Sequence, residues 1–136
     1  MLSMRIPNEK VKESLALFID KANYSITLNE ETMNNMMIVE EGSTIIGFAN
    51  YVIKDEEYWI DHLYIEPSFR KRKIGDGLIR ALLNLMDRRS IRTVFMKLPT
   101  GFAAYLTVDS YKKDENIYTA TLPDFFEKPC KGSAKS

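Results

Sequence analysis

The sequence contains little of the side-chain chemistry that builds metal centres and disulfides. Its 136 residues include one cysteine, Cys130, and one histidine, His62. A single cysteine excludes an intramolecular disulfide, and a zinc site built from cysteine and histidine needs about four such ligands. We therefore expect no metal cofactor.

Long hydrophobic runs and an excess of one charge are also missing. No apolar stretch approaches the roughly 20 residues that cross a bilayer, and residues 7–10 (PNEK) interrupt the start of the chain, so we expect neither a membrane span nor a signal peptide. The default location is then cytoplasmic. The 19 basic side chains balance the 19 acidic ones, which argues against a protein that coats nucleic acid or an anionic membrane.

The chain does contain enough apolar residues for one core. They make up 45% of a sequence whose length fits one domain. We find no internal repeat or linker, and therefore predict a single domain over residues 1–126. Residues 127–136 (EKPCKGSAKS) are predicted to form a flexible tail.

Apolar periodicity predicts an α/β fold with a mixed, mainly antiparallel sheet flanked by helices. Asn8 is the expected N-cap of the first helix, a second short helix is expected to begin at Asn29, and Gly47 is expected at a bulge or a close backbone approach. The predicted helices span residues 8–23, from after Pro67 to Arg89, and 101–110, and the predicted strands span residues 36–40, 44–54, 58–66, 93–98 and 117–122. Short turns favour antiparallel pairing of the first three strands, whereas the long helix favours parallel pairing of strands 58–66 and 93–98.

The most informative segment is residues 60–79 (IDHLYIEPSFRKRKIGDGLI). A strand leads into four consecutive cations at residues 70–73, and the chain then passes through Gly75 and Gly77 into an amphipathic helix. Helix N–H groups, glycines and basic side chains together favour an anion such as pyrophosphate. A solvated basic surface and a nucleic-acid or nuclear-localisation patch are the two alternatives.

This segment resembles motif A of the GNAT acetyltransferases. The motif positions are matched by Pro67, Arg70, Ile74, Gly75, Leu78 and Ile79, and residues 63–65 (LYI) and 46–49 (IGFA) resemble the preceding strands of the family. The resemblance covers about residues 36–111. It implies a parallel strand pair splayed around an acyl-CoA site at a bulge near Tyr64 and Ile65, whose backbone would polarise the thioester carbonyl. It implies transfer of an acetyl group from acetyl-CoA to a primary amine of a small molecule or a protein. It also implies a cofactor-binding set made of Tyr64, Ile65, Arg70, Lys71, Arg72, Lys73, Ile74, Gly75 and Asp76.

One motif position departs from the family. Its first glycine falls on Lys73, where a positive φ would cost a lysine about 1–2 kcal/mol. A second register, through Arg72, Gly75 and Gly77, restores the glycines but moves them relative to Pro67. We prefer the first register because it keeps Pro67 and Arg70 in place. Asp76 suits the helix dipole but would repel a diphosphate that it faced.

The resemblance implies catalytic roles for Asp61 as the base and Tyr105 as the acid. His62, Glu66 and a water chain are alternatives for the base. On a regular strand Asp61 and His62 would face opposite sides of the sheet, so at most one would point into the cleft. Cys130 lies in the predicted tail, and we assign it no role.

Two questions stay open at this level. The departure at Lys73 leaves room for a non-catalytic domain of this fold that binds acyl-CoA or serves as a protein-interaction module. The family often pairs through its sheet edge or C-terminal strand, so a homodimer is one expectation for the assembly. The sequence does not predict the acceptor amine.

Overall fold

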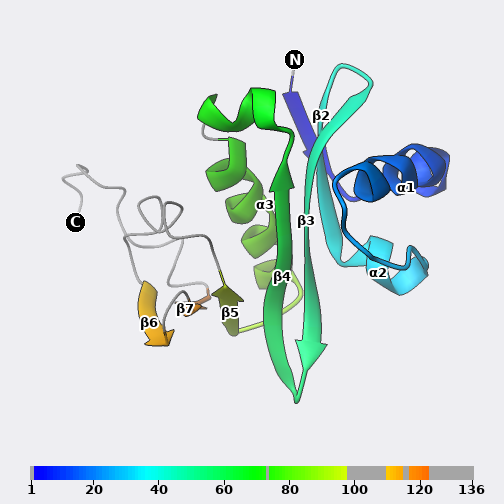
Figure 1. The fold of residues 1–136 in the computed structure, drawn as a ribbon. Coiled ribbons are helices and arrows are strands. Elements are labelled where there is room, and N and C mark those ends of the chain that lie inside the picture. Colours follow the sequence, from blue (N-terminus) through cyan, green and yellow to red (C-terminus); the bar gives the residue numbers. More distant parts are fainter. Residues whose placement is uncertain (1, 73, 98–109, 115–116, 123–136) are drawn as a thin grey trace.

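The structure, a computed structural model, describes residues 2–72, 74–97, 110–114 and 117–122 (Figure 1). Its strands are β1 (Leu2–Arg5), β2 (Met36–Glu41), β3 (Thr44–Lys54), β4 (Glu57–Ile65), β5 (Thr93–Lys97), β6 (Ser110–Asp114) and β7 (Ile117–Thr121). Its helices are α1 (Lys12–Lys21), α2 (Glu30–Asn34) and α3 (Ile74–Arg88), with 3₁₀ turns η1 (Glu9–Val11) and η2 (Pro67–Arg72).

The seven strands form one sheet in the order β1-β2-β3-β4-β5-β7-β6. Strands β4 and β5 pair in parallel, as predicted, because α3 connects them as a helical crossover. The other described pairs are antiparallel. The mixed, mainly antiparallel α/β fold predicted from the sequence is therefore confirmed.

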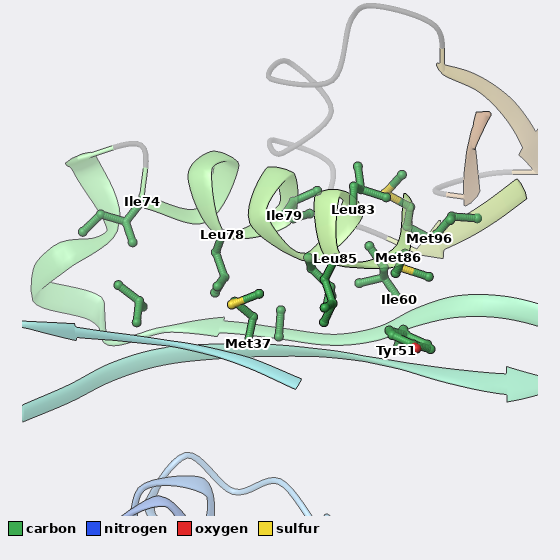
Figure 2. Close-up of a cluster of buried hydrophobic side chains, with 14 of the residues drawn as sticks. Met37, Tyr51, Ile60, Ile74, Leu78, Ile79, Leu83, Leu85, Met86 and Met96 are labelled. Carbon is green, nitrogen blue, oxygen red and sulfur yellow. The ribbon is translucent and has the colours of Figure 1, made fainter. Parts of the chain in front are cut away.

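Helices cover both faces of the sheet: α3 lies on one side, and α1 and α2 lie on the other (Figure 1). The larger core lies under α3, where Leu78 and Met86 are fully buried against the sheet (Figure 2). A smaller core under α1 contains Leu15 and Phe48. Within the described part of the chain, no helix is long and apolar enough to cross a membrane.

Asn29 caps α2 as expected, whereas Asn8 caps the 3₁₀ turn η1, and α1 begins after Val11 without a side-chain cap. Asn8 Oδ1 accepts a hydrogen bond from Lys10 N at 3.0 Å, and Asn29 Oδ1 accepts one from Thr32 N at 2.8 Å. The first predicted helix is shorter than expected, because η1 precedes α1. Two strands, β1 and β6, were not predicted, and Ser110, placed by the sequence in a helix, begins β6. The rest of that predicted helix lies outside the described residues.

Two irregularities shape the middle of the sheet. The register between β2 and β3 shifts near Gly47, where an added Cβ would lie 2.8 Å from the Tyr64 carbonyl oxygen, so the bulge and the close approach predicted there are both confirmed. In the β3–β4 ladder, Asn50 pairs with His62 and Tyr51 pairs with Ile60. Asp61 is therefore an extra residue that bulges from β4.

Candidate active site

The candidate site is built around the end of β4. Its parallel ladder with β5 joins Tyr58–Ile60 to Val94–Met96, whereas β4 itself continues to Ile65 and is followed at once by η2. The 3₁₀ turn η2 runs across the N-terminal end of α3 (Figure 1). The last residues of β4 therefore lie next to the start of α3. The resemblance placed the bulge of β4 near Tyr64 and Ile65, but the structure has it at Asp61.

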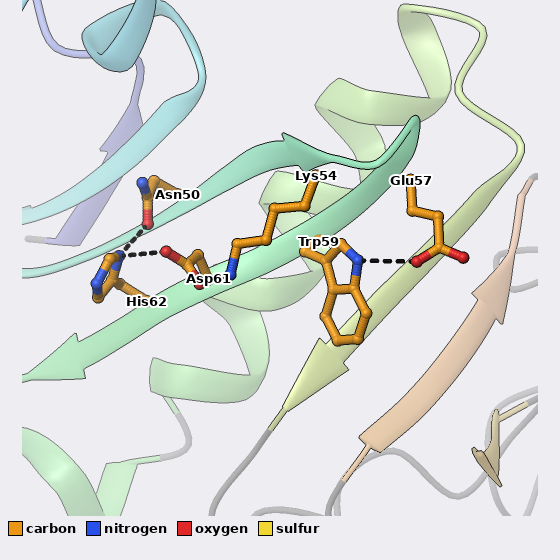
Figure 3. A network of polar contacts seen from close by, with 6 residues as sticks. All are labelled: Asn50, Lys54, Glu57, Trp59, Asp61 and His62. Atoms are coloured by element: carbon orange, nitrogen blue, oxygen red, sulfur yellow. Dashed lines mark hydrogen bonds and ion pairs between the residues drawn. The ribbon is translucent and has the colours of Figure 1, made fainter. Parts of the chain in front are cut away.

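The polar group, made of the side chains of Lys54, Asp61 and His62, lies at the bulge on the side of β4 away from α3 (Figure 3). Asp61 Oδ1 lies 3.2 Å from Lys54 Nζ, and Asp61 Oδ2 lies 3.4 Å from His62 Nδ1 (Figure 3). The expectation that Asp61 and His62 face opposite sides of the sheet is therefore wrong. It assumed a regular strand, and the bulge breaks the alternation of side chains.

His62 has a second polar contact, from the neighbouring strand. Its Nδ1 lies 3.0 Å from Oδ1 of Asn50, a residue that is only 2% exposed. A buried amide costs free energy unless it is hydrogen-bonded, so this contact fixes the imidazole to β3. Nothing in the sequence pattern marks Asn50, because its role depends on the β3–β4 register.

Aromatic rings continue the site along β4. The Tyr64 ring lies 5.7 Å from each of the Phe18 and Tyr24 rings, and Tyr24 also lies 5.3 Å from His62. These contacts are edge-on, an arrangement that rings favour. They form a wall between α1 and β4 that begins at the polar group.

A cleft of about 470 Å³ opens beside this wall. It lies between the end of α1, the start of β3 and the turn after β4. Its lining includes Phe18, Lys21, Ile45, Tyr64, Glu66 and Phe69. Glu66, one of the alternative bases, accepts a 2.6 Å hydrogen bond from Ser68 Oγ and lies at this end of β4, away from the bulge.

A stacked pair of aromatic rings lies where β4 and β5 pair in parallel. The rings of Trp59 and Phe95 stack with their centroids 5.2 Å apart, and Trp59 Nε1 donates to Glu57 Oε1 at 3.2 Å (Figure 3). Because their ladder neighbours Ile60 and Met96 belong to the core under α3, the stacked pair lies on the opposite face. It therefore shares the face of the sheet that carries the polar group.

The start of α3 is the place where the sequence predicts that an anion such as pyrophosphate binds. The N–H groups of the first helical turn have no acceptor within the helix, and the turn carries a partial positive charge. Ile74 and Gly75 begin this turn and are buried. Asp76, expected to repel an anion, forms an ion pair with Arg80, whose Nε lies 3.4 Å from its Oδ2. The ion pair compensates only Oδ2, because Asp76 Oδ1 is buried and has no hydrogen-bond partner in the described part of the chain.

The remaining predicted site residues are placed only in part. Arg70, Lys71 and Arg72 belong to η2, directly before α3, and Ile65 is buried in the core under α3. Lys73, Tyr105 and Cys130 lie outside the described residues. Among the residues that the structure does describe, no three histidine, cysteine or acidic side chains gather as a metal site would require.

Solved structures of low sequence identity share this fold. N-acetylglutamate synthase from Neisseria gonorrhoeae, complexed with coenzyme A and N-acetyl-glutamate, matches with a TM-score of 0.67 and 14% identity over 90% of this chain. This chain spans 35% of that protein's length. The PaiA N-acetyltransferase from Thermoplasma acidophilum, in complex with coenzyme A, matches with a TM-score of 0.61 and 17% identity, over 89% of this chain and 99% of that one.

A third solved structure matches a similar share of this chain. The ribosomal-protein-S18-alanine N-acetyltransferase from Escherichia coli has a TM-score of 0.67 and 11% identity, over 90% of this chain and 94% of its own. No curated protein matches the sequence. The model of the acetyltransferase (GNAT) family matches residues 5–107, which include the bulge of β4, η2 and α3. With this match over most of its length, the chain belongs to the acetyltransferase (GNAT) family.

Proposed function

We propose that the protein is an N-acetyltransferase that transfers an acetyl group from acetyl-CoA to a primary amine by direct attack in a ternary complex. The match to the GNAT family over residues 5–107 carries this proposal. The polar group at the bulge of β4, and the start of α3 beyond the end of that strand, support it. The proposal includes the single domain over residues 1–126.

The proposed cofactor site lies at the start of α3. Backbone amides of residues 70–75 and the basic run that begins at Arg70 hold the pyrophosphate, since helix N-termini and cations bind such anions. The backbone at Tyr64 and Ile65 polarises the thioester carbonyl. When bound, acetyl-CoA supplies the activated acetyl group.

The proposed acid and base come from two parts of the chain. Tyr105 protonates the leaving thiolate. The Asp61–His62 pair removes a proton from the acceptor ammonium. We assign this role to the pair because their side chains lie 3.4 Å apart at the bulge of β4.

Calorimetric titration with acetyl-CoA tests the cofactor. ATP and dephospho-CoA serve as controls, because both contain adenine and phosphates. ATP lacks the pantetheine arm of coenzyme A, and dephospho-CoA lacks its 3′-phosphate. We expect saturable micromolar binding of acetyl-CoA and weaker binding of both controls. An absence of heat at millimolar acetyl-CoA would refute the proposal.

Release of free thiol from acetyl-CoA in the presence of primary amines tests the reaction. The panel includes glutamate, whose acetylated form is bound in one of the similar structures, and a peptide that begins with alanine, the residue named for another. Turnover with any amine supports the proposed acetyltransferase activity. Tight binding without turnover would instead identify a non-catalytic acyl-CoA-binding or protein-interaction module.

A further inference from the structure

The contacts of His62 determine which ring nitrogen carries its proton. Nδ1 lies 3.0 Å from Asn50 Oδ1 and 3.4 Å from Asp61 Oδ2. Both oxygens accept hydrogen bonds, so the neutral ring satisfies them only with its proton on Nδ1. This tautomer leaves the lone pair on Nε2, which has no hydrogen-bond partner within the described part of the chain.

We infer that His62, acting through Nε2, is the general base of the proposed acetyl transfer, and that Asp61 and Asn50 are positioning residues for its ring. The inference rests on the proposed function and assigns separate roles to the Asp61–His62 pair. A carboxylate that orients an imidazole through Nδ1 leaves Nε2 free to take a proton. The side chain of His62 is 25% exposed, which leaves it accessible to an acceptor.

Asp61 is less suited to take the proton itself. Its Oδ1 pairs with the Lys54 ammonium and its Oδ2 faces Nδ1 of His62. Both oxygens are thus already in contact with nitrogen atoms of neighbouring side chains. The charged or titratable groups that face His62 among the described residues are Asp61, with its partner Lys54, and Tyr24.

The proposed step accounts for every proton. Nε2 of His62 accepts a proton from the acceptor ammonium, and the neutral amine attacks the thioester carbonyl. The C–N bond forms and the C–S bond breaks. Tyr105, the proposed acid, protonates the departing thiolate, which leaves as free thiol, and regains a proton from the attacking nitrogen. His62 then releases its proton to solvent, so one proton is liberated in each turnover.

The tautomer can be measured directly, because His62 is the only histidine in the chain. Long-range ¹H–¹⁵N correlation spectra of the ¹⁵N-labelled full chain will contain one imidazole. At a pH where the ring is neutral, we expect a protonated Nδ1 and an unprotonated Nε2. The opposite pattern would overturn the inference. In Asn50→Leu, which removes the nearer acceptor, we expect a greater share of the Nε2–H form than in the parent.

Turnover tests the catalytic role, with the acceptor found by the amine panel. His62→Gln should lower kcat by about 10²-fold or more, while acetyl-CoA affinity and the thermal unfolding midpoint stay near those of the parent. The acidic limb of the kcat/KM profile should disappear. In His62→Gly, added imidazole should restore part of the activity, which a merely structural role would not predict.

The outcomes separate the two proposals. If the parent protein binds no acetyl-CoA or turns over no amine, the proposed function fails and the catalytic role of His62 fails with it. If the parent is active and His62→Gln retains its kcat and its pH profile, the role of His62 alone is wrong. Asp61→Asn should lower kcat less than His62→Gln, because an amide oxygen still accepts from Nδ1. A larger loss in Asp61→Asn would make Asp61 the base.

Discussion

Gly47 of β3 and Ile65 of β4 are packed so closely that a single methyl group would not fit between them. A Cβ added at Gly47 would lie 2.7 Å from Ile65 Cδ1 and 2.9 Å from Val39 Cγ1. Nearby, the Glu66 amide donates to the Ile46 carbonyl at 2.7 Å. Together these contacts fix the end of β4, from which the chain enters η2 and α3.

Gly47→Ala should therefore destabilise the protein. Overpacking of this kind typically costs about 1–3 kcal/mol, because the neighbouring backbone must shift. Urea denaturation of parent and variant measures the change in the free energy of unfolding.

Gly77→Ala is the matched control for Gly47→Ala. Among the described residues its Cβ would meet only the Met4 Cε atom, at 3.3 Å, which is the end of a flexible side chain. Alanine also favours a helix by up to about 1 kcal/mol over glycine. We expect unchanged or increased stability. If both variants lose the same free energy, the close approach at Gly47 does not explain its effect.

Arg89→Ala should also lower stability, because Arg89 joins the end of α3 to the end of α2 and to Tyr51 of β3. Its NH1 donates to Asn35 Oδ1 at 3.0 Å and to Tyr51 OH at 2.8 Å, and its NH2 donates to Asn34 Oδ1 at 3.3 Å. The variant leaves the buried Tyr51 hydroxyl without this donor, at a cost of about 1–3 kcal/mol.

Arg88→Ala makes the same charge change one residue earlier, at an exposed position. We expect a change within about 0.5 kcal/mol, as for surface substitutions in general. Adding Tyr51→Phe to Arg89→Ala removes the stranded hydroxyl and should recover part of the loss. Equal effects of Arg88→Ala and Arg89→Ala on urea denaturation would contradict the assigned contacts.

Sequence patterns predicted the long elements well because their periodicity reflects burial. Strand β3 has the predicted bounds, and α3 buries the stripe from Ile74 to Met86. Strand β1 was missed because four residues carry too short a pattern. It is held instead by pairing with β2 and by Arg5, whose Nε lies 2.8 Å from Glu40 Oε1.

The sequence predicted only two of the polar side chains that meet at the bulge of β4. Asp61 and His62 were identified as candidate bases, but their relation depends on a bulge that side-chain alternation does not encode. Asn50 and Lys54 approach them from β3, across the sheet. Such partners follow from the pairing of β3 with β4 and from the shift of their register at the bulge, which the order of residues along one strand does not reveal.

Gly75→Val should abolish acetyl-CoA binding if the start of α3 holds the diphosphate. Gly75 is the second residue of α3 and is buried, so a branched side chain would stand where phosphate must approach the backbone. Calorimetry measures the binding, and far-UV circular dichroism shows whether the helices persist. Gly77→Ala should bind normally. A Gly75→Val protein that binds as tightly as the parent would show that the cofactor lies elsewhere.

Arg70→Ala should weaken acetyl-CoA binding without unfolding the protein. A charge-assisted hydrogen bond to phosphate contributes about 1.5–3 kcal/mol, so the dissociation constant should rise about 10- to 100-fold. Because screening by salt weakens such contacts, the affinity of Arg70→Ala should also depend less on salt than that of the parent. Arg88→Ala removes an equal charge at the far end of α3 and should change neither quantity. If both variants weaken binding equally, the effect of Arg70 comes from net charge and not from a contact with the cofactor.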